Sequence, residues 1–147
     1  MSGRRVKMRI LIDGADGSGK TTLAKKLADK YNLSYIDLRG KDPMTFEFNY
    51  NLLDKTNVVF DRSFLSDRLY SKFYGLPPRL TKGQERTLVQ KCLDQDIEII
   101  LCIPEEHKVL PSEDTDIKLR HEELVQGYKE LASEYNLKVI DPFKEEV

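Results

Sequence analysis

The chain has 147 residues, of which 39% are hydrophobic and 33% are charged, and its formal net charge is −1. This balance is typical of one folded domain with its own core, so we expect residues 1–147 to form a single domain. The low net charge gives no general attraction for nucleic acid, and no apolar run approaches the roughly 20 residues of a membrane span. We therefore expect neither a nucleic-acid nor a membrane partner.

The first elements enclose a glycine-rich segment. An apolar run at 8–12 predicts a buried strand, and an amphipathic run at 22–31 predicts a helix. Between them, residues 14–21 have the G-x-x-x-x-G-K-[ST] spacing of a P-loop, whose backbone N–H groups surround phosphate oxygens at a helix N-terminus. We expect Lys20 to reach the β- and γ-phosphates of ATP and the Thr21 hydroxyl to bind Mg²⁺. The predicted ATP-binding residues are Gly14, Ala15, Asp16, Gly17, Ser18, Gly19, Lys20, Thr21 and Thr22.

The remaining chain alternates between strand and helix patterns. Further strands are predicted at 33–38, 57–61, 97–103 and 137–140, and helices at about 63–74, after the capping-box sequence 81–84, and at 116–135. The segment 44–55 is ambiguous between helix and strand, and 104–115 reads as a loop. This alternation predicts an α/β fold in three layers, with a five-stranded parallel sheet covered by helices on both faces.

Charged residues follow the second and third predicted strands. Because ligands of open α/β sheets bind at the carboxyl ends of the strands, we expect these residues to face the P-loop. Asp61 would join Thr21 in holding Mg²⁺, and Arg62 would bind a phosphate with its planar guanidinium. Asp37 and Arg39 are candidates for the acceptor side.

Three motifs resemble the thymidylate kinase family and the sister deoxynucleoside kinases. They are the P-loop with its flanks at 13–22, the pair Asp61-Arg62-Ser63 with Ser66-Asp67-Arg68, and the helix sequence at 121–131. The resemblance implies a P-loop NTPase fold with strand order 2-3-1-4-5, ATP with Mg²⁺ as donor, a small nucleotide or nucleoside as acceptor, and a homodimer as in many members. It implies roles for Asp16, Asp61, Arg62 and Asp67. Together with the other candidates, the expected catalytic residues are Lys20, Asp61, Arg62 and Asp37, and the expected acceptor-binding residues are Asp16, Arg39, Arg62, Ser66, Asp67 and Tyr70.

Two departures from the family pattern concern specificity and rate. No arginine occurs between 40 and 61, so thymine recognition is not implied, and an ionised Asp67 would favour a base with an exocyclic amino group. The predicted lid at about 104–118 lacks paired arginines, so Lys108, Lys118 or Arg120 would have to replace them. If Arg120 faces solvent, we expect slow turnover.

The acceptor is left open by the sequence. Asp37 could deprotonate the 5′-hydroxyl of a deoxynucleoside, whereas Arg39 with Arg62 could bind the phosphate of a monophosphate. We favour a (deoxy)nucleoside monophosphate kinase over a deoxynucleoside kinase, a 5′-polynucleotide kinase or a non-catalytic nucleotide-binding protein. A GTPase is disfavoured because a D-x-x-G sequence at 37–40 has no N-K-x-D partner.

The cellular compartment is inferred from the chain start and the cysteines. The basic start lacks the long apolar run of an export signal. Cys92 and Cys102 fall in apolar patterns and form no C-x-x-C, which predicts buried thiols in a reducing compartment. We therefore expect a cytoplasmic protein.

Overall fold

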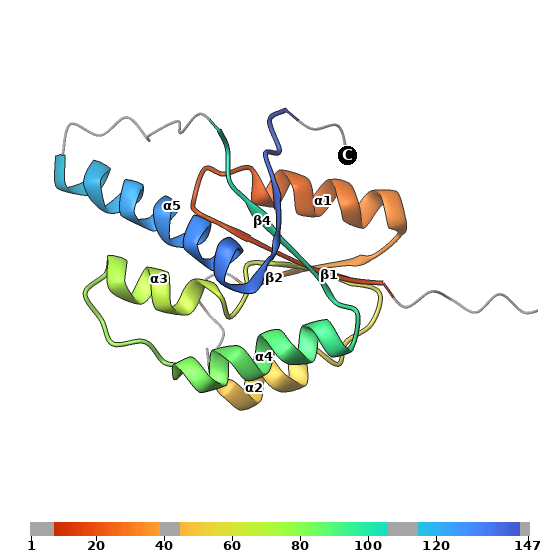
Figure 1. Cartoon of the computed structure of the whole chain (residues 1–147). Helices are drawn as coiled ribbons and strands as arrows, with labels where there is room; N and C mark the ends of the chain where they lie inside the picture. The colour runs from red at the N-terminus through yellow and green to blue at the C-terminus, as the bar shows by residue number, and fades with distance from the viewer. Residues whose placement is uncertain (1–7, 39–44, 106–114, 145–147) are drawn as a thin grey trace, which may run out of the picture.

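Five parallel strands form one sheet in the order β2-β3-β1-β4-β5 (Figure 1). The computed structural model describes residues 8–38, 45–105 and 115–144, with side chains omitted at 115–118. The strands are β1 Arg9–Gly14, β2 Ser34–Asp37, β3 Val58–Asp61, β4 Glu98–Cys102 and β5 Lys138–Ile140. The helices are α1 Lys20–Tyr31, α2 Phe46–Leu52, α3 Ser66–Phe73, α4 Lys82–Asp94 and α5 Thr115–Tyr135. The predicted fold class and strand order are confirmed.

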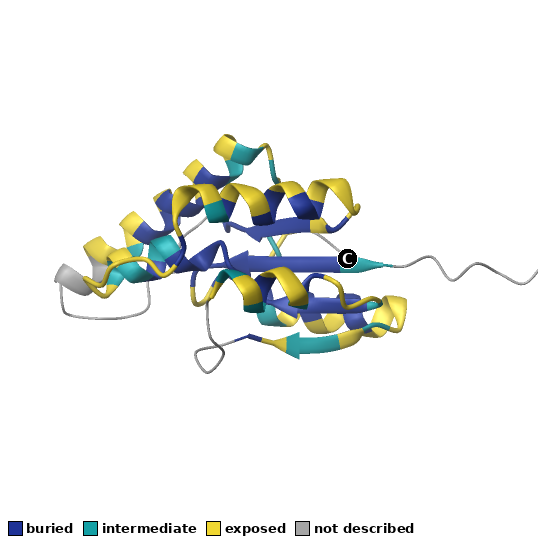
Figure 2. Cartoon of the chain, turned by 90° about the horizontal axis from the view of Figure 1, so that it is seen from below, coloured by how far each residue is buried: buried dark blue, intermediate teal, exposed yellow. Residues whose placement is uncertain are grey.

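Alternate residues of the strands pack into two cores on opposite faces of the sheet. Leu11, Phe60 and Leu101 face the larger core, which contains apolar residues of α3, α4 and α5. Ile12 and Val59 face the smaller core, which is covered by α1. Figure 2 shows the buried central strands β1, β3 and β4 between helices whose outer surfaces are exposed. Across the described ranges, no helix combines the length and the apolar character needed to cross a membrane.

Local signals account for the helix starts that the sequence predicts well. Thr81 begins α4 with a complete capping box: its side chain accepts from the Gln84 amide, and the Gln84 side chain accepts from the Thr81 amide. The ambiguous segment after residue 44 contains the helix α2. Thr45 caps it by accepting from the Phe48 amide, and the rings of Phe46 and Tyr50 lie 5.5 Å apart at the i, i+4 spacing of a helix.

Two boundaries near the P-loop differ from the prediction. β1 continues two residues past Ile12, because Asp13 and Gly14 pair with Leu101 and Cys102 of β4. The helix predicted from about Ser63 begins instead at Ser66. The polar groups of Ser63 are engaged by Asp13, so Ser63 takes part in a turn before the helix. The carboxyl ends of β1 and β3 are thereby joined at one edge of the sheet.

Candidate active site

The P-loop runs from the end of β1 into the first turn of α1. Gly17 and Gly19 have φ values of 81° and 84°, in the left-handed region that a Cβ disfavours. These conformations let the loop close over the N-terminus of α1, where free N–H groups and the helix dipole attract anions. Lys20 is buried, and its Nζ lies 3.4 Å from a carboxylate oxygen of Asp16. The loop therefore has the geometry of a phosphate site.

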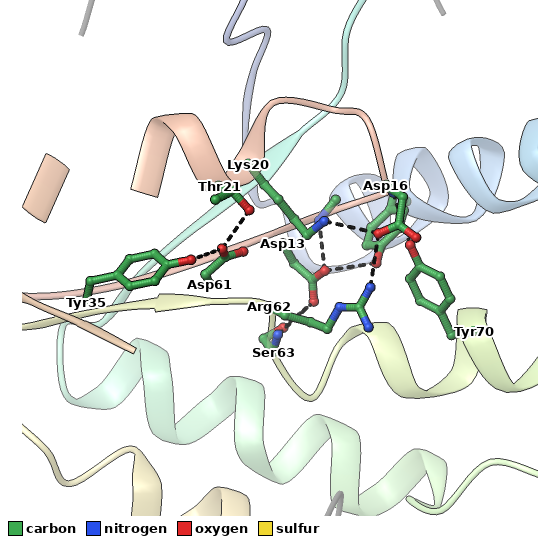
Figure 3. A network of polar contacts seen from close by, with 11 residues as sticks. Asp13, Asp16, Lys20, Thr21, Tyr35, Asp61, Arg62, Ser63 and Tyr70 are labelled. Atoms are coloured by element: carbon green, nitrogen blue, oxygen red, sulfur yellow. Dashed lines mark hydrogen bonds and ion pairs between the residues drawn. The ribbon is translucent and has the colours of Figure 1, made fainter. Parts of the chain in front are cut away.

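Thr21 and Asp61 lie together on the α1 side of the sheet (Figure 3). The Thr21 hydroxyl donates to Asp61 Oδ2 over 2.8 Å, and the Tyr35 hydroxyl donates to the same oxygen. Asp61 is fully buried, yet its Oδ1 has no hydrogen-bond partner among the described residues. An oxygen pair with one unused buried carboxylate oxygen fits Mg²⁺, which takes its other ligands from phosphate and water. The described residues contain no cluster of three acidic, histidine or cysteine side chains that would form a separate metal site.

Arg62 follows β3 with a φ of 80°, an unusual conformation for a residue other than glycine. Its guanidinium carbon lies 4.5 Å from the centre of the Tyr70 ring, and Nη2 lies 3.2 Å from Asp16. The Tyr70 hydroxyl in turn accepts from the Asp16 amide over 3.1 Å. Figure 3 shows Arg62 between the P-loop and α3. The Nε of Arg62 is buried and has no hydrogen-bond partner among the described groups.

Asp13 is a second buried carboxylate, on the opposite face of the sheet from Asp61. It accepts from the Ser63 amide and hydroxyl over 3.1 and 2.6 Å, from the Tyr128 hydroxyl over 2.9 Å and from the Gly14 amide over 2.8 Å. Burial raises the pKa of this carboxyl group, and the hydrogen bond from Ser63 partly offsets that rise. Burial likewise raises the pKa of Tyr128. Asp13 connects β1, the turn after β3 and α5.

A cavity of about 190 Å³ adjoins Arg62 on the α3 side. It is smaller than the roughly 300–1,000 Å³ of common ligand pockets, so it would hold part of a ligand. Tyr74 and Leu76 stand exposed at its rim, and the Tyr70 and Tyr74 rings lie 6.3 Å apart. Four of the predicted acceptor-binding residues line it. They are Arg62, Ser66, Asp67 and Tyr70.

Asp67 has a contact that the sequence did not indicate. Its carboxylate accepts from the backbone amides of Arg79 and Leu80, at 3.0 Å for the nearest oxygen of each. The residue is buried and anchors the segment that leads into α4. Recognition of a base by Asp67 stays a prediction. A base would have to bind a carboxylate that already accepts hydrogen bonds from the cavity wall.

The other predicted residues fall into three groups. Asp37 ends β2 in register with Asp61, so the two lie on neighbouring strands at the same edge. Arg39 and Lys108 lie outside the described residues, and the side chain of Lys118 is likewise not described. Arg120 is exposed and lines a groove of about 290 Å³ between α3 and α5, so the structure does not bring it to the P-loop.

Several residues near the site were not recognised from sequence. Arg79 lines the cavity beside Arg62, and His121 lines a small cavity next to P-loop residues 15–18. Pro142 and the exposed Phe143 pack against Gly19. The helix pattern predicted that His121 lies on the inward side of its helix but indicated no partner for it.

Both cysteines are buried as predicted, and burial raises the pKa of each thiol to about 12.

Known proteins resemble this chain locally in sequence and broadly in fold. No family model matches the chain. It is 39% identical over 51 residues to a cytidylate kinase from Alkaliphilus oremlandii and 49% identical over 35 residues to a shikimate kinase from Staphylococcus epidermidis. These stretches cover 34% and 24% of this chain but only 24% and 21% of the two relatives. The chain thus spans about a quarter or less of the curated relatives that it matches.

Solved structures match over nearly the whole chain. The YorR protein from Bacillus subtilis, in complex with phosphorylated GDP, has a TM-score of 0.76 at 21% identity, covering 93% of this chain and 87% of that one. Deoxyadenosine kinase from M. mycoides with bound dATP has a TM-score of 0.57 at 17% identity, covering 95% and 93%. Thymidylate kinase from Candida albicans has a TM-score of 0.56 at 15% identity, covering 92% and 84%. The chain has the fold shared by the P-loop nucleotide and nucleoside kinases.

Proposed function

We propose that this protein is an ATP-dependent kinase that transfers the γ-phosphoryl group to a (deoxy)nucleoside monophosphate. The observation that carries the proposal is the position of Arg62. Its guanidinium pairs with Asp16 of the P-loop, and the residue also lines the cavity on the α3 side, which we take as the acceptor site. A position next to both the loop and this cavity supports a role for Arg62 in stabilising the phosphoryl group during transfer.

Different residues would bind the donor phosphates, stabilise the transferred group and hold Mg²⁺. Lys20 and the P-loop amides bind the donor phosphates, and Arg62 stabilises charge on the phosphoryl group in flight. Thr21 and Asp61 would hold Mg²⁺, which neutralises charge between the β- and γ-phosphates when it is bound. The exposed ring of Phe143 beside Gly19 offers a surface for the donor base.

A monophosphate acceptor is favoured by a second cation at the cavity. Arg79 lines it together with Arg62, so two guanidinium groups are within reach of an acceptor phosphate. The specific observation that supports a deoxynucleoside kinase instead is the register of Asp37 with Asp61, which places a carboxylate of β2 at the same edge. In that case Asp37 would accept the proton of the 5′-hydroxyl.

A transfer assay with radiolabelled ATP tests the proposal. The protein is incubated with Mg²⁺ and each deoxynucleoside, each monophosphate, or an oligonucleotide with a 5′-hydroxyl. We expect label in at least one diphosphate, and a loss of about 100-fold or more in Lys20→Ala. Asp37→Asn should leave that rate nearly unchanged, whereas it should abolish phosphorylation of a nucleoside. ATP binding without transfer to any acceptor would contradict the proposal.

Because the described part of the chain brings no arginine of α5 to the P-loop, we also expect slow turnover compared with kinases that have lid arginines. A rate in the ordinary range of about 1–100 s⁻¹ would be inconsistent with this expectation.

A further inference from the structure

The backbone at Arg62 is held in its unusual conformation from both sides. The Arg62 amide donates to the Ile12 carbonyl over 2.8 Å, and the Ser63 amide donates to Asp13 Oδ2 over 3.1 Å. A left-handed conformation costs an L-residue free energy, so it persists only where surrounding contacts impose it. Here those contacts are made by the last residues of β1. The direction in which the Arg62 side chain leaves the backbone is thus fixed by the strand that also begins the P-loop.

The hydrogen bonds to Asp13 use both of its oxygens. Oδ1 accepts from Gly14 and Tyr128, and Oδ2 accepts from the two groups of Ser63. The Ser63 hydroxyl oxygen accepts from the Leu65 amide over 3.0 Å, so its own hydrogen is directed to Asp13. An acceptor surrounded by donors is best served by the ionised form of the carboxyl group. Asp13 has no exposed surface and cannot touch a substrate.

Tyr128 brings α5 into the same contact. It is among the largest fully buried side chains, and its hydroxyl donates to Oδ1 of Asp13, whereas Ser63 donates to Oδ2. Three segments that are far apart in the chain therefore meet at one carboxylate. Of the hydrogen bonds to this carboxylate, the two from Ser63 hold the residue that directly follows Arg62.

We infer that Asp13 is a positioning residue that sets the orientation of the Arg62 guanidinium, with Ser63 and Tyr128 acting through it. The inference rests on the proposed function, in which Arg62 contacts the transferred phosphoryl group. It assigns to Asp13 no contact with ATP or with the acceptor. Loss of Asp13 should therefore lower kcat while leaving the affinity for ATP largely intact.

The orientation of Arg62 can be observed without any acceptor. In ¹⁵N-labelled protein the Nε–Hε signal of Arg62, identified by its absence in Arg62→Lys, should be displaced by the ring current of Tyr70, because the guanidinium stacks on that ring. In Asp13→Asn we expect this signal to move towards that of a solvent-exposed arginine. An unchanged signal would overturn the inference. If Asp13→Asn does not fold, Ser63→Ala and Tyr128→Phe decide the question, since each removes one donor and keeps the carboxylate.

Kinetics supply the second measurement. With the best acceptor found, Asp13→Asn should lower kcat about 100-fold, the size of effect expected when a catalytic group is displaced by about 1 Å. Tyr128→Phe should lower kcat about fivefold, in line with the loss of one hydrogen bond. The dissociation constant of a fluorescent ATP analogue should change little in either variant. A fall in melting temperature with kcat and the Arg62 signal unchanged would show that Asp13 is only structural.

Tyr135→Phe is the matched control. It removes a hydroxyl from the same helix, where Tyr135 donates to Glu85 over 2.7 Å, away from Arg62. We expect this variant to lose stability without any change in kcat or in the Arg62 signal. If the wild-type protein transfers phosphate to no acceptor, the proposed function fails, but the spectroscopic test of Asp13 still gives its own answer.

Discussion

Asp13 and Asp61 lie near the carboxyl ends of neighbouring parallel strands but face opposite sides of the sheet. Ile12 is in register with Asp61, so Asp13 lies one residue further along β1. Successive side chains of a strand point to opposite faces. Asp61 consequently meets Thr21 of α1, and Asp13 meets Ser63 and Tyr128 on the side of α3 and α5. Asp61 can therefore contribute to a metal site, whereas Asp13 makes its contacts within the protein.

The left-handed backbone at Arg62 predicts that a glycine variant at this position is more stable than an alanine variant. Arg62→Gly should have a higher free energy of unfolding than Arg62→Ala by about 1 kcal/mol, because only alanine keeps a Cβ at a φ of 80°. Both variants lose the guanidinium and should be equally inactive. Urea denaturation of the two proteins measures the difference.

Arg68 provides the control, since it lies inside α3. There the order should reverse, with the glycine variant less stable by about 1 kcal/mol, because glycine is a poor helix former. If alanine were also the more stable replacement at position 62, the backbone of Arg62 would not be under strain.

The sequence predicted the positions of candidate site residues where these positions depend on local spacing or on strand order. The P-loop is contiguous, and the meeting of Thr21 with Asp61 follows from parallel strands that share an edge. The sequence did not predict the role of Asp13, because its partners lie 50 and 115 residues away and no local pattern marks a buried carboxylate. The contact of Asp67 with the amides of residues 79 and 80 depends on the path of an irregular segment, which periodicity does not describe.

Helices were predicted best where their own residues determine their ends. The capping box of α4 lies within four consecutive residues, and it is found as predicted. The start of α3 was placed about three residues too early, because the turn at Ser63 is determined by Asp13 across the sheet. A helix start that depends on a distant partner cannot be read from local propensity.

Thr81→Ala tests how far the cap stabilises α4. The variant should lose about 1 kcal/mol of stability, because the Gln84 amide loses its acceptor and the reciprocal bond is weakened. Thr87→Ala on the same helix is the control: the Thr87 hydroxyl donates to the Gly83 carbonyl in mid-helix, so its loss should be nearly neutral. Thermal unfolding followed by circular dichroism compares the two. Equal destabilisation would mean that the cap has no special role.

At the scale of the molecule, charged residues join α3, α4 and α5 away from the P-loop. Glu134 accepts from Arg68 over 2.8 Å and from Lys82, and the buried Glu85 lies 3.3 Å from Arg68. These contacts connect three helices that share one core but not one stretch of sequence. The hydrogen bond from Lys82 is the main reason that the pKa of Glu134 lies below its usual 4.5, with Arg68 adding to the effect.

This arrangement predicts a stability difference that depends on pH. Glu134→Gln should cost about 0.5–1 kcal/mol at neutral pH, as is usual for a partly exposed ion pair. Because the folded-state pKa is lowered, the contribution of Glu134 is present above pH 4.5 and disappears as pH falls through that lower pKa. Urea titrations at about pH 7 and pH 3 should show the two proteins converging in acid. Glu122→Gln, an exposed site on the same helix, should show no such convergence; a constant difference for Glu134→Gln would argue against the network.

Asp16 gives the phosphate site an internal counter-ion. Its carboxylate is exposed, yet it forms ion pairs with both Lys20 and Arg62. A phosphate bound in the loop would compete with Asp16 for both cations, so its binding would exchange one anion for another. An anion that contacted only the two cations would gain less from this exchange than a polyphosphate chain, which has more oxygens to offer the loop amides.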